Sequence, residues 1–171
     1  MKPDIQPPTD VRTDALRLLS NGVYVLTACH QEVIHAATIT WATQVSIQPA
    51  LVLVALRRNS RLAHAVRKGR RFALNILASD QQDIAETFFT HHSDNEETAA
   101  MGGQAFRMTE SHCPLLTEAL GWIECRLADE PASPGDHMLM LGEVTGAGVR
   151  RQGEPMVLWS SPWSYGGSQE S

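Results

Sequence analysis

The 171-residue sequence lacks several features that would place it at once in a familiar class of protein. It has no apolar run long enough to cross a bilayer, and its N-terminal segment MKPDIQPPTD lacks the apolar stretch of a signal peptide. Its net charge is -5, whereas a general nucleic-acid binder usually carries a basic excess. These absences predict a cytoplasmic protein that binds neither membranes nor nucleic acid.

The short motifs that hold nucleotides, nucleophiles and metals in common enzyme folds are also missing. Neither GxGxxG nor GxxxxGK(S/T) occurs, and there is no GxSxG or HExxH. Cys29, Cys113 and Cys125 form no CxxC pair, so neither a disulfide framework nor a thiolate zinc site is expected. His91 and His92 precede several acidic residues, but they lack the spacing of a metal site, so no metal is predicted.

The residues that are present predict a mainly β protein. Hydrophobic residues make up 43% of the chain, which is enough for one core of ordinary size. Apolar, β-branched and alternating runs predict seven strands, at 22–29, 32–41, 51–56, 72–77, 121–130, 137–149 and 156–160. Because short links join neighbouring strands without regular βαβ alternation, we expect an antiparallel β-barrel with peripheral helices.

The remaining segments predict short helices and polar connections. Helices are expected at 14–19, 61–69 and 82–89, with a helical turn at 114–120 and a long surface loop at 91–112. The whole chain is interpreted as a flexible lead-in (1–11), a single domain (12–167) and a tail (168–171).

The stretch ATITWATQVSIQP at 37–49 begins in the predicted strand 32–41 and, if it continues as one strand, has an unusual pair of faces. With a period of two, Ile39, Trp41 and other apolar residues fall on one face. The opposite face carries Thr38, Thr40, Ala42, Gln44 and Ser46, which are small or polar and uncharged. A solvent-facing side would normally carry lysine or glutamate. Two interpretations follow, a surface kept clear for a flat ligand and an ordinary barrel interior lined by small residues.

Positive charge is concentrated in one segment of the chain. Seven of the fourteen basic residues fall within 57–71, which contains no acidic residue. Ser60 begins a predicted helix there, and the free N–H groups of a helix start favour phosphate. A basic surface patch or ion pairs between subunits would explain the same cluster. Further along, Gly135 and Asp136 predict a turn that presents His137 at the start of a strand, in either a structural or a functional role.

Taken together, these strings resemble the flavin reductase-like family of FMN-binding split β-barrels. The similar stretches are GVYVLTA, ATITWATQVSIQPALVLVAL, FALNILASDQQDIAETFF, CPLLTEALGWIECRL, GDHMLMLGEV and PWSYGG. They cover roughly residues 12–167 and imply a Greek-key antiparallel split barrel. Trp41 and Gln44, which replace serines of the common pattern, place the chain near flavoredoxin-like proteins and the reductase domains of diflavin proteins.

The resemblance also implies a set of site residues. Those expected to bind cofactor are Thr38, Thr40, Trp41, Ala42, Thr43, Ser46, Arg57, Ser60, Arg61, Asn75, Gln81, Trp163 and Tyr165. His137 is expected to be the catalytic residue, beside the nicotinamide or the reduced flavin. Thr40 departs from the family pattern, which has asparagine at this position, and Ala50 replaces the second proline of a common pair.

The resemblance implies an NAD(P)H:flavin oxidoreductase, or flavin reductase. NADH or NADPH would deliver a hydride to FMN, with FAD as a further candidate, and reduced flavin would pass to a monooxygenase, another redox protein, oxygen or ferric iron. A homodimer is expected because the site of this family usually lies at a dimer interface. Two alternatives stay open, an FMN-binding electron-transfer protein without NAD(P)H turnover and a flavin-free barrel such as a haem-handling relative.

Overall fold

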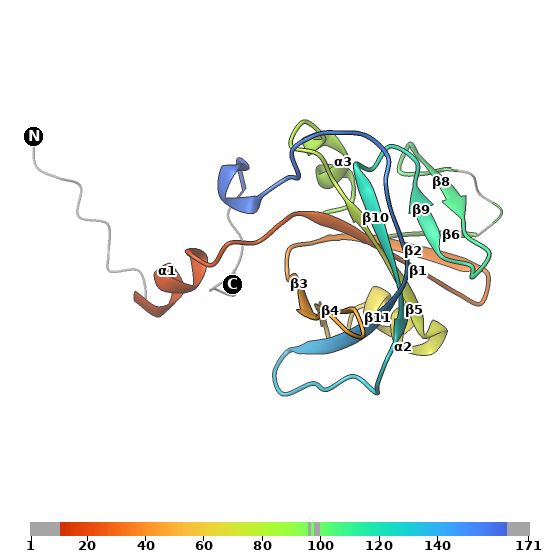
Figure 1. The fold of residues 1–171 in the computed structure, drawn as a ribbon, viewed down its shortest axis with the longest axis horizontal. Coiled ribbons are helices and arrows are strands. Elements are labelled where there is room, and N and C mark those ends of the chain that lie inside the picture. Colours follow the sequence, from red (N-terminus) through yellow and green to blue (C-terminus); the bar gives the residue numbers. More distant parts are fainter. Residues whose placement is uncertain (1–10, 96, 98–99, 164–171) are drawn as a thin grey trace, which may run out of the picture.

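A computed structural model describes residues 11–95, 97 and 100–163 of the chain (Figure 1). Within these residues, eight strands form one antiparallel sheet in the order β3-β4-β11-β10-β5-β1-β2-β6, and three more form a small second sheet. The large sheet contains β1 (Tyr24–His30), β2 (Val33–Ile39), β3 (Ala42–Ser46), β4 (Leu51–Arg57), β5 (Arg71–Ile76), β6 (His92–Asn95), β10 (Gly121–Leu127) and β11 (His137–Val149). The small sheet contains β7 (Ala100–Met101), β8 (Gln104–Met108) and β9 (Pro114–Leu116).

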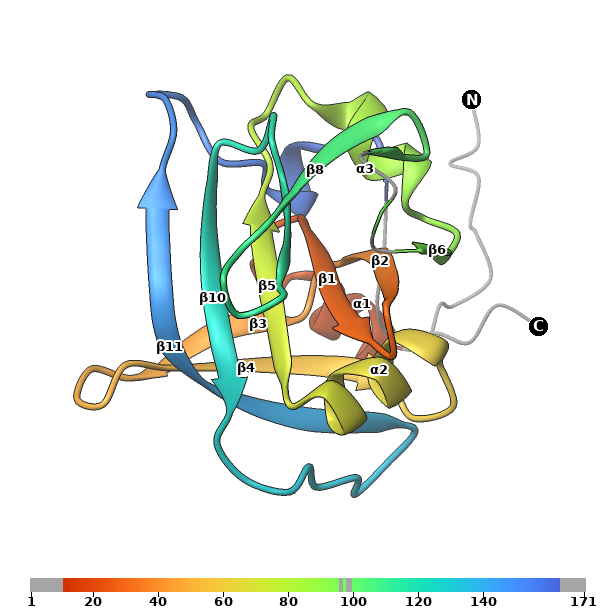
Figure 2. The same ribbon diagram turned by 90° about the vertical axis from the view of Figure 1, so that its right-hand side faces the viewer.

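The long strand β11 connects two parts of the large sheet that run in different directions (Figure 2). Residues 137–143 of β11 pair with β4, whereas residues 142–149 pair with β10, which continues the sheet to β5 and β1. Gly142 lies at the changeover, where an added Cβ would lie 2.6 Å from the Phe72 ring and 2.7 Å from the Cβ of Cys125. A larger residue would therefore press into the core at the point where the sheet changes direction.

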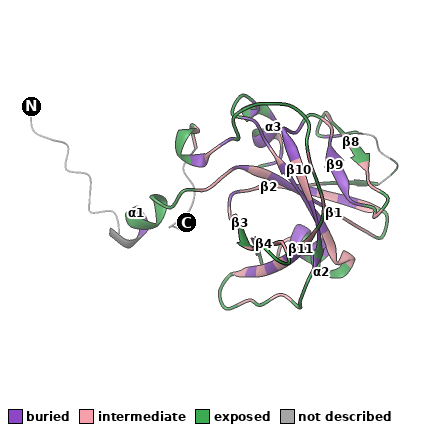
Figure 3. Cartoon of the chain, in the orientation of Figure 1, coloured by how far each residue is buried: buried purple, intermediate pink, exposed green. Residues whose placement is uncertain are grey.

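The helices are short and lie outside the sheet. They are α1 (Val11–Arg17), α2 (Arg61–Gly69), α3 (Gln82–Thr87) and the 3-10 helix η1 (Leu158–Ser160). Helix α2 begins where the Ser60 hydroxyl accepts a hydrogen bond from the Ala63 amide, and it ends at Arg70 in the left-handed conformation. Figure 3 shows α1 projecting from the sheet with largely exposed residues, while the central strands are buried. No helix in the described ranges is both long and apolar enough to span a membrane.

The mainly β, antiparallel architecture predicted from the sequence is confirmed, but three segments were assigned wrongly. Residues 156–160, predicted as a strand, contain the 3-10 helix η1. The other two segments are neighbours. Residues 91–112, predicted as a surface loop, contain β6, β7 and β8. Residues 114–120, predicted as a helical turn, begin with β9. These strands have two to five residues each. Backbone pairing rather than a long alternation of apolar residues defines them, so periodicity gives little signal.

The segment 37–49, predicted as one strand, is two. Strand β2 ends at Ile39 and β3 begins at Ala42. Strand β2 pairs with β1 and β6 near one edge of the large sheet, whereas β3 pairs with β4 at the opposite edge. The chain must leave one edge and join the other, so it turns at Thr40 and Trp41 and the predicted alternation of faces is interrupted there.

Candidate active site

A cavity of about 630 Å³ lies beside the turn at Thr40 and Trp41. Its walls come from β2, the end of β4, the start of α2, the first residue of β11 and the C-terminal segment. This volume is within the range of about 300–1,000 Å³ that is usual for small-molecule sites. Seven of the residues predicted from the sequence line it, namely Thr38, Thr40, Trp41, Arg57, Ser60, His137 and Trp163.

His137 is fixed in the cavity wall by contacts on several sides. It is the first residue of β11 and pairs across the sheet with Arg57 of β4. Its ring centroid lies 4.7 Å from that of Trp41, and its Nδ1 lies 2.7 Å from Oδ1 of Asp136. The hydrogen bond from His137, followed by the charge of His137, holds the pKa of Asp136 below its usual range.

The Thr40 hydroxyl differs from every other buried side-chain polar atom in the described part of the chain, because it has no hydrogen-bond partner. Thr40 is 9% exposed and lines the cavity. The hydroxyl of its neighbour Thr38, by contrast, donates to the Ala85 carbonyl at 2.8 Å. A buried polar group without a partner costs roughly 1–3 kcal/mol, which a polar atom of a ligand would offset.

The basic segment at 57–71 is divided between the cavity and the surface. Arg57 lines the cavity, as does Ser60, which caps α2. Further along, Arg67 and Arg70 both pair with Glu130, at 2.7 and 3.2 Å. The anion site predicted from the sequence is therefore compatible with the first part of the segment. Ion pairs within the chain, which the sequence did not predict, account for Arg67 and Arg70.

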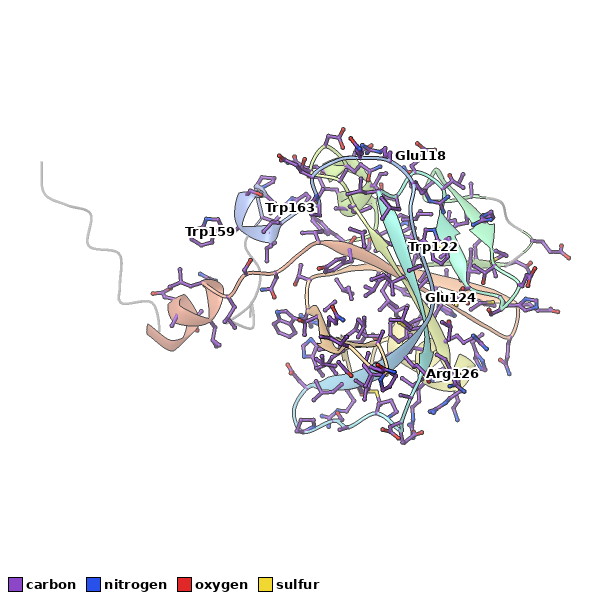
Figure 4. All side chains as sticks on the ribbon, viewed as in Figure 1. Glu118, Trp122, Glu124, Arg126, Trp159 and Trp163 are labelled. Atoms are coloured by element: carbon purple, nitrogen blue, oxygen red, sulfur yellow. The ribbon has the colours of Figure 1, made fainter. Side chains whose placement is uncertain are left out.

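Two aromatic residues close to the C-terminus of the described chain occupy different environments. Trp159 and Trp163 both belong to the C-terminal segment (Figure 4), but Trp159 is 72% exposed whereas Trp163 lines the cavity. Trp163 meets Phe89 edge to face, with ring centroids 4.8 Å apart. Phe89 and His91 also line the cavity, although neither was predicted. They follow α3 in a stretch that the sequence assigns to a helix end and a polar loop, so no local signal distinguishes them.

Several predicted site residues lie away from this cavity. Ala42 and Thr43 line a second cavity, of about 280 Å³. Ser46 ends β3, and Arg61 is an exposed residue in the first turn of α2. Ala42, Thr43 and Ser46 lie away from the first cavity because they belong to β3, which is at the opposite edge of the large sheet from β2. Tyr165 lies outside the described residues.

Asn75 and Gln81 are buried and bonded to the fold rather than to the cavity. The Asn75 amide donates to the Val25 carbonyl and the Thr27 hydroxyl, and its Oδ1 accepts from the Leu116 amide at 2.8 Å. Gln81 Oε1 accepts from the Ala78 amide, and Nε2 donates to the Glu118 carbonyl. The structure therefore places both side chains in supporting positions, where backbone groups and the Thr27 hydroxyl satisfy their polar atoms.

A histidine pair lies at one side of the cavity. His35 Nδ1 and His91 Nε2 are 3.0 Å apart, so one nitrogen donates and the other accepts. Burial, followed by the charges of His91, His30, Arg61 and His64, lowers the pKa of His35 from 6.5 to about 4. The pKa of His91 is also lowered, chiefly by burial. The folded protein therefore favours a neutral pair.

Stability should consequently fall as the solution is acidified below about pH 6.5. The unfolded chain takes up a proton on His35 at a higher pH than the folded chain does, because the pKa of folded His35 is about 4. The stabilising contribution is complete above about pH 6.5 and is lost towards about pH 4. Urea midpoints measured across this range should vary less with pH in His35→Gln than in the wild type. His112→Asn is the control, because His112 is exposed and is not among the charges that act on His35. A pH dependence in His35→Gln equal to that of the wild type would contradict the assignment.

Comparison with known proteins identifies the family of this fold. The model of the family described as "Flavin reductase like domain" matches residues 16–164. The chain belongs to the flavin reductase family. Its resemblance to that family, inferred from short strings, is confirmed over nearly the whole sequence.

Individual members of the flavin reductase family give the same assignment. The reductase component of 4-nitrophenol 4-monooxygenase/4-nitrocatechol 2-monooxygenase from Rhodococcus opacus is 33% identical over 149 residues, covering 86% of this chain and 77% of its own. An NADH-dependent FMN reductase of Streptomyces nodosus subsp. asukaensis is 36% identical over 132 residues, covering 76% and 69%. An NADH:FAD oxidoreductase of Streptomyces globisporus, solved with NAD and FAD fragments, is 26% identical with a TM-score of 0.73, covering 90% and 91%. The predicted class of enzyme, a flavin reductase using a flavin and a pyridine nucleotide, is thereby confirmed.

The residues of this flavin reductase's cavity fit a flavin. The unpartnered hydroxyl of Thr40 suits a polar atom of the ligand, and the guanidinium of Arg57 suits a phosphate. Trp41 and Trp163 supply aromatic surface for a flat ring. The cavity therefore offers a polar, a cationic and an aromatic contact that are compatible with FMN.

Removing the Thr40 hydroxyl should change stability and binding in opposite directions. Thr40→Val keeps the shape and deletes a buried group that has no partner, so we expect the ligand-free protein to gain about 1 kcal/mol. FMN should bind about fivefold more weakly, because one hydrogen bond is lost. Urea denaturation and fluorescence titration measure the two effects. Thr38→Val is the matched control and should be destabilised, since its hydroxyl donates to Ala85. A loss of stability in Thr40→Val would show that its hydroxyl is satisfied within the fold.

Proposed function

We propose that this protein reduces FMN, or FAD, with NADH or NADPH in the cavity beside Thr40 and Trp41. The observation that carries the proposal is that Arg57, His137 and the unpartnered Thr40 hydroxyl line one cavity of ligand size. Bound flavin supplies the ring that accepts the hydride, so the protein needs to align two rings rather than to provide a strong acid or base.

The proposed roles follow from position in the cavity wall. Arg57 and the start of α2 at Ser60 would hold the flavin phosphate through a positive charge and free helix N–H groups. Thr40 would hydrogen-bond to the flavin, and Trp41 would pack against its ring. His137, which contacts Trp41 and pairs with Arg57, would orient the nicotinamide.

The finer features of assembly are also part of the proposal. We infer a cytoplasmic homodimer whose large sheets form Greek-key split barrels, and which passes reduced flavin to a monooxygenase or another redox partner. The Rhodococcus relative, which is named as a reductase component of a monooxygenase, supports the partner. Val45 and Ile47, 49% and 88% exposed near the second cavity, give apolar surface for a second copy.

A steady-state assay of NADH and NADPH oxidation, with FMN titrated into the dialysed protein, tests the function. Saturating, flavin-dependent oxidation above the free-flavin background is expected and would name the preferred donor. Bound FMN without oxidation would instead indicate an electron carrier. Absence of both would overturn the proposal.

A substitution in the cavity wall tests the location of the site. Ala55 of β4 lines the cavity, so the indole of Ala55→Trp should occupy ligand space and weaken FMN binding at least about tenfold, or ~1.4 kcal/mol. Ala105→Trp, at an exposed position on β8, is the matched control. Circular dichroism establishes that both variants are folded. Unchanged FMN affinity in Ala55→Trp would mean that the flavin binds elsewhere.

A further inference from the structure

The contact between Asp136 and His137 determines which ring nitrogen of His137 carries the proton. Nδ1 of His137 lies 2.7 Å from Oδ1 of Asp136. An ionised carboxylate can only accept a hydrogen bond, so Nδ1 carries the proton. His137 lines the cavity whereas Asp136 does not, and the Asp136 side chain is 73% exposed. The neutral imidazole is therefore left with Nε2, a hydrogen-bond acceptor, for the cavity.

Hydrogen bonds hold the backbone on both sides of Asp136 in place. The Asp136 carbonyl accepts from the Arg58 amide at 2.9 Å, which attaches the turn to the end of β4. The Leu139 amide donates to the Ala132 carbonyl at 2.7 Å and closes the loop before β11. The Ser133 hydroxyl donates to the His137 carbonyl at 3.3 Å. The carboxylate thus extends from a turn bonded at both ends, although its own side chain is exposed.

Neighbouring groups restrict the imidazole as well. Trp41 contacts the ring, with centroids 4.7 Å apart and planes tilted by 57°. Arg57 is the cross-strand partner of His137, and it places a positive charge on the same wall. Nε2 of His137 suits an uncharged N–H donor of a ligand. The neighbouring guanidinium of Arg57 suits a phosphate of the same ligand.

We propose that Asp136 is a positioning residue that keeps His137 in the Nδ1–H form, so that Nε2 accepts a hydrogen bond from the carboxamide of the pyridine nucleotide. The second part of this inference rests on the proposed function, whereas the first part concerns the ligand-free protein alone. Asp136 touches neither substrate nor flavin, and no proton or electron passes through it. Its effect on the reaction is the orientation of one acceptor atom.

Nitrogen-15 NMR of histidine-labelled, ligand-free protein tests the first part. At about pH 8, where free imidazole is neutral, the wild type should show the Nδ1–H tautomer for His137. Asp136→Ala should shift it to Nε2–H, and Asp136→Asn, which keeps a carbonyl acceptor, should retain Nδ1–H. Asp129→Ala, at an exposed position in the same connection between β10 and β11, is the matched control. An Nε2–H tautomer in the wild type, or no change in Asp136→Ala, would overturn the proposal whether or not the protein reduces flavin.

Kinetics test the second part. Asp136→Ala should raise KM for the nicotinamide donor about tenfold, the scale of one hydrogen bond, while FMN affinity stays within about twofold. Asp136→Asn should recover most of the loss. With reduced 3-acetylpyridine adenine dinucleotide, which has a methyl group in place of the amide, Asp136→Ala should cost nothing. Adding Asp136→Ala to His137→Ala should have no further effect. An equal penalty with both donors, or an additive double variant, would overturn the carboxamide contact.

Discussion

Replacing Asn75 with alanine should lower the free energy of unfolding by about 3 kcal/mol or more. The Asn75 side chain is fully buried and bonds to Val25, Thr27 and the Leu116 amide. Alanine leaves these groups without a partner, and each buried orphan costs roughly 1–3 kcal/mol. These hydrogen bonds join β5 to β1 and β9. Losing them should therefore destabilise the centre of the large sheet and its connection to the small sheet. Urea denaturation of the ligand-free protein measures the change.

Asn59→Ala is the matched control for this substitution, since Asn59 is exposed in the turn between β4 and α2. A surface change of this kind is expected to fall within about 0.5 kcal/mol of the wild type. FMN affinity of folded Asn75→Ala should be nearly unchanged, because the side chain does not line the cavity. Weaker FMN binding at unchanged stability would restore the cofactor-binding role that the resemblance implies for Asn75.

Replacing His137 with alanine should lower turnover roughly a hundredfold, the loss expected when reacting groups are poorly aligned. The imidazole lies between Trp41, Asp136 and the cavity, so its removal frees both the indole and the space that the nicotinamide would occupy. FMN affinity should change less than turnover, because Arg57 and Thr40 remain. Steady-state kinetics and flavin titration on the same preparation separate the two quantities.

His64→Ala is the control for the His137 prediction. His64 is exposed on α2 and does not line the cavity, so its turnover should match that of the wild type. An unchanged rate in His137→Ala would remove His137 from the mechanism. An equal loss of turnover and FMN affinity would instead assign His137 to flavin binding.

The parts of the fold predicted correctly are those that have a strong local signal. The runs at 51–56 and 72–77 are apolar enough to mark buried strands, and Ser60 marks the start of α2. The interruption at Thr40 and Trp41 has no such signal, because it depends on which distant strands β2 and β3 pair with. Strand β9 also lacks a local signal. It is recognisable only by its pairing with β8 and by its hydrogen bond to Asn75.

The residues of the candidate site also differ in whether a local sequence signal predicts their position. His137 was placed correctly at the start of β11 because a turn and a strand adjoin in the sequence. Asn75 and Gln81 stand in motifs of the family, but their hydrogen bonds to backbone are visible only in three dimensions. Phe89 and His91 reach the cavity through the path of the chain after α3, which periodicity does not describe.

The turn at Thr40 and Trp41 has a consequence for the order of folding. It joins β2 and β3, which are neighbours along the chain but lie six places apart in the large sheet. The cavity takes its walls from β2, β4 and β11, so it exists only once the strands between them have assembled and the sheet has coiled. Such pairings over long sequence separations form slowly. A partly assembled sheet therefore does not contain the cavity. Recovery of flavin binding should therefore report refolding of the large sheet from β4 to β2, and a fragment that lacks β2 or β4 lacks part of the cavity wall.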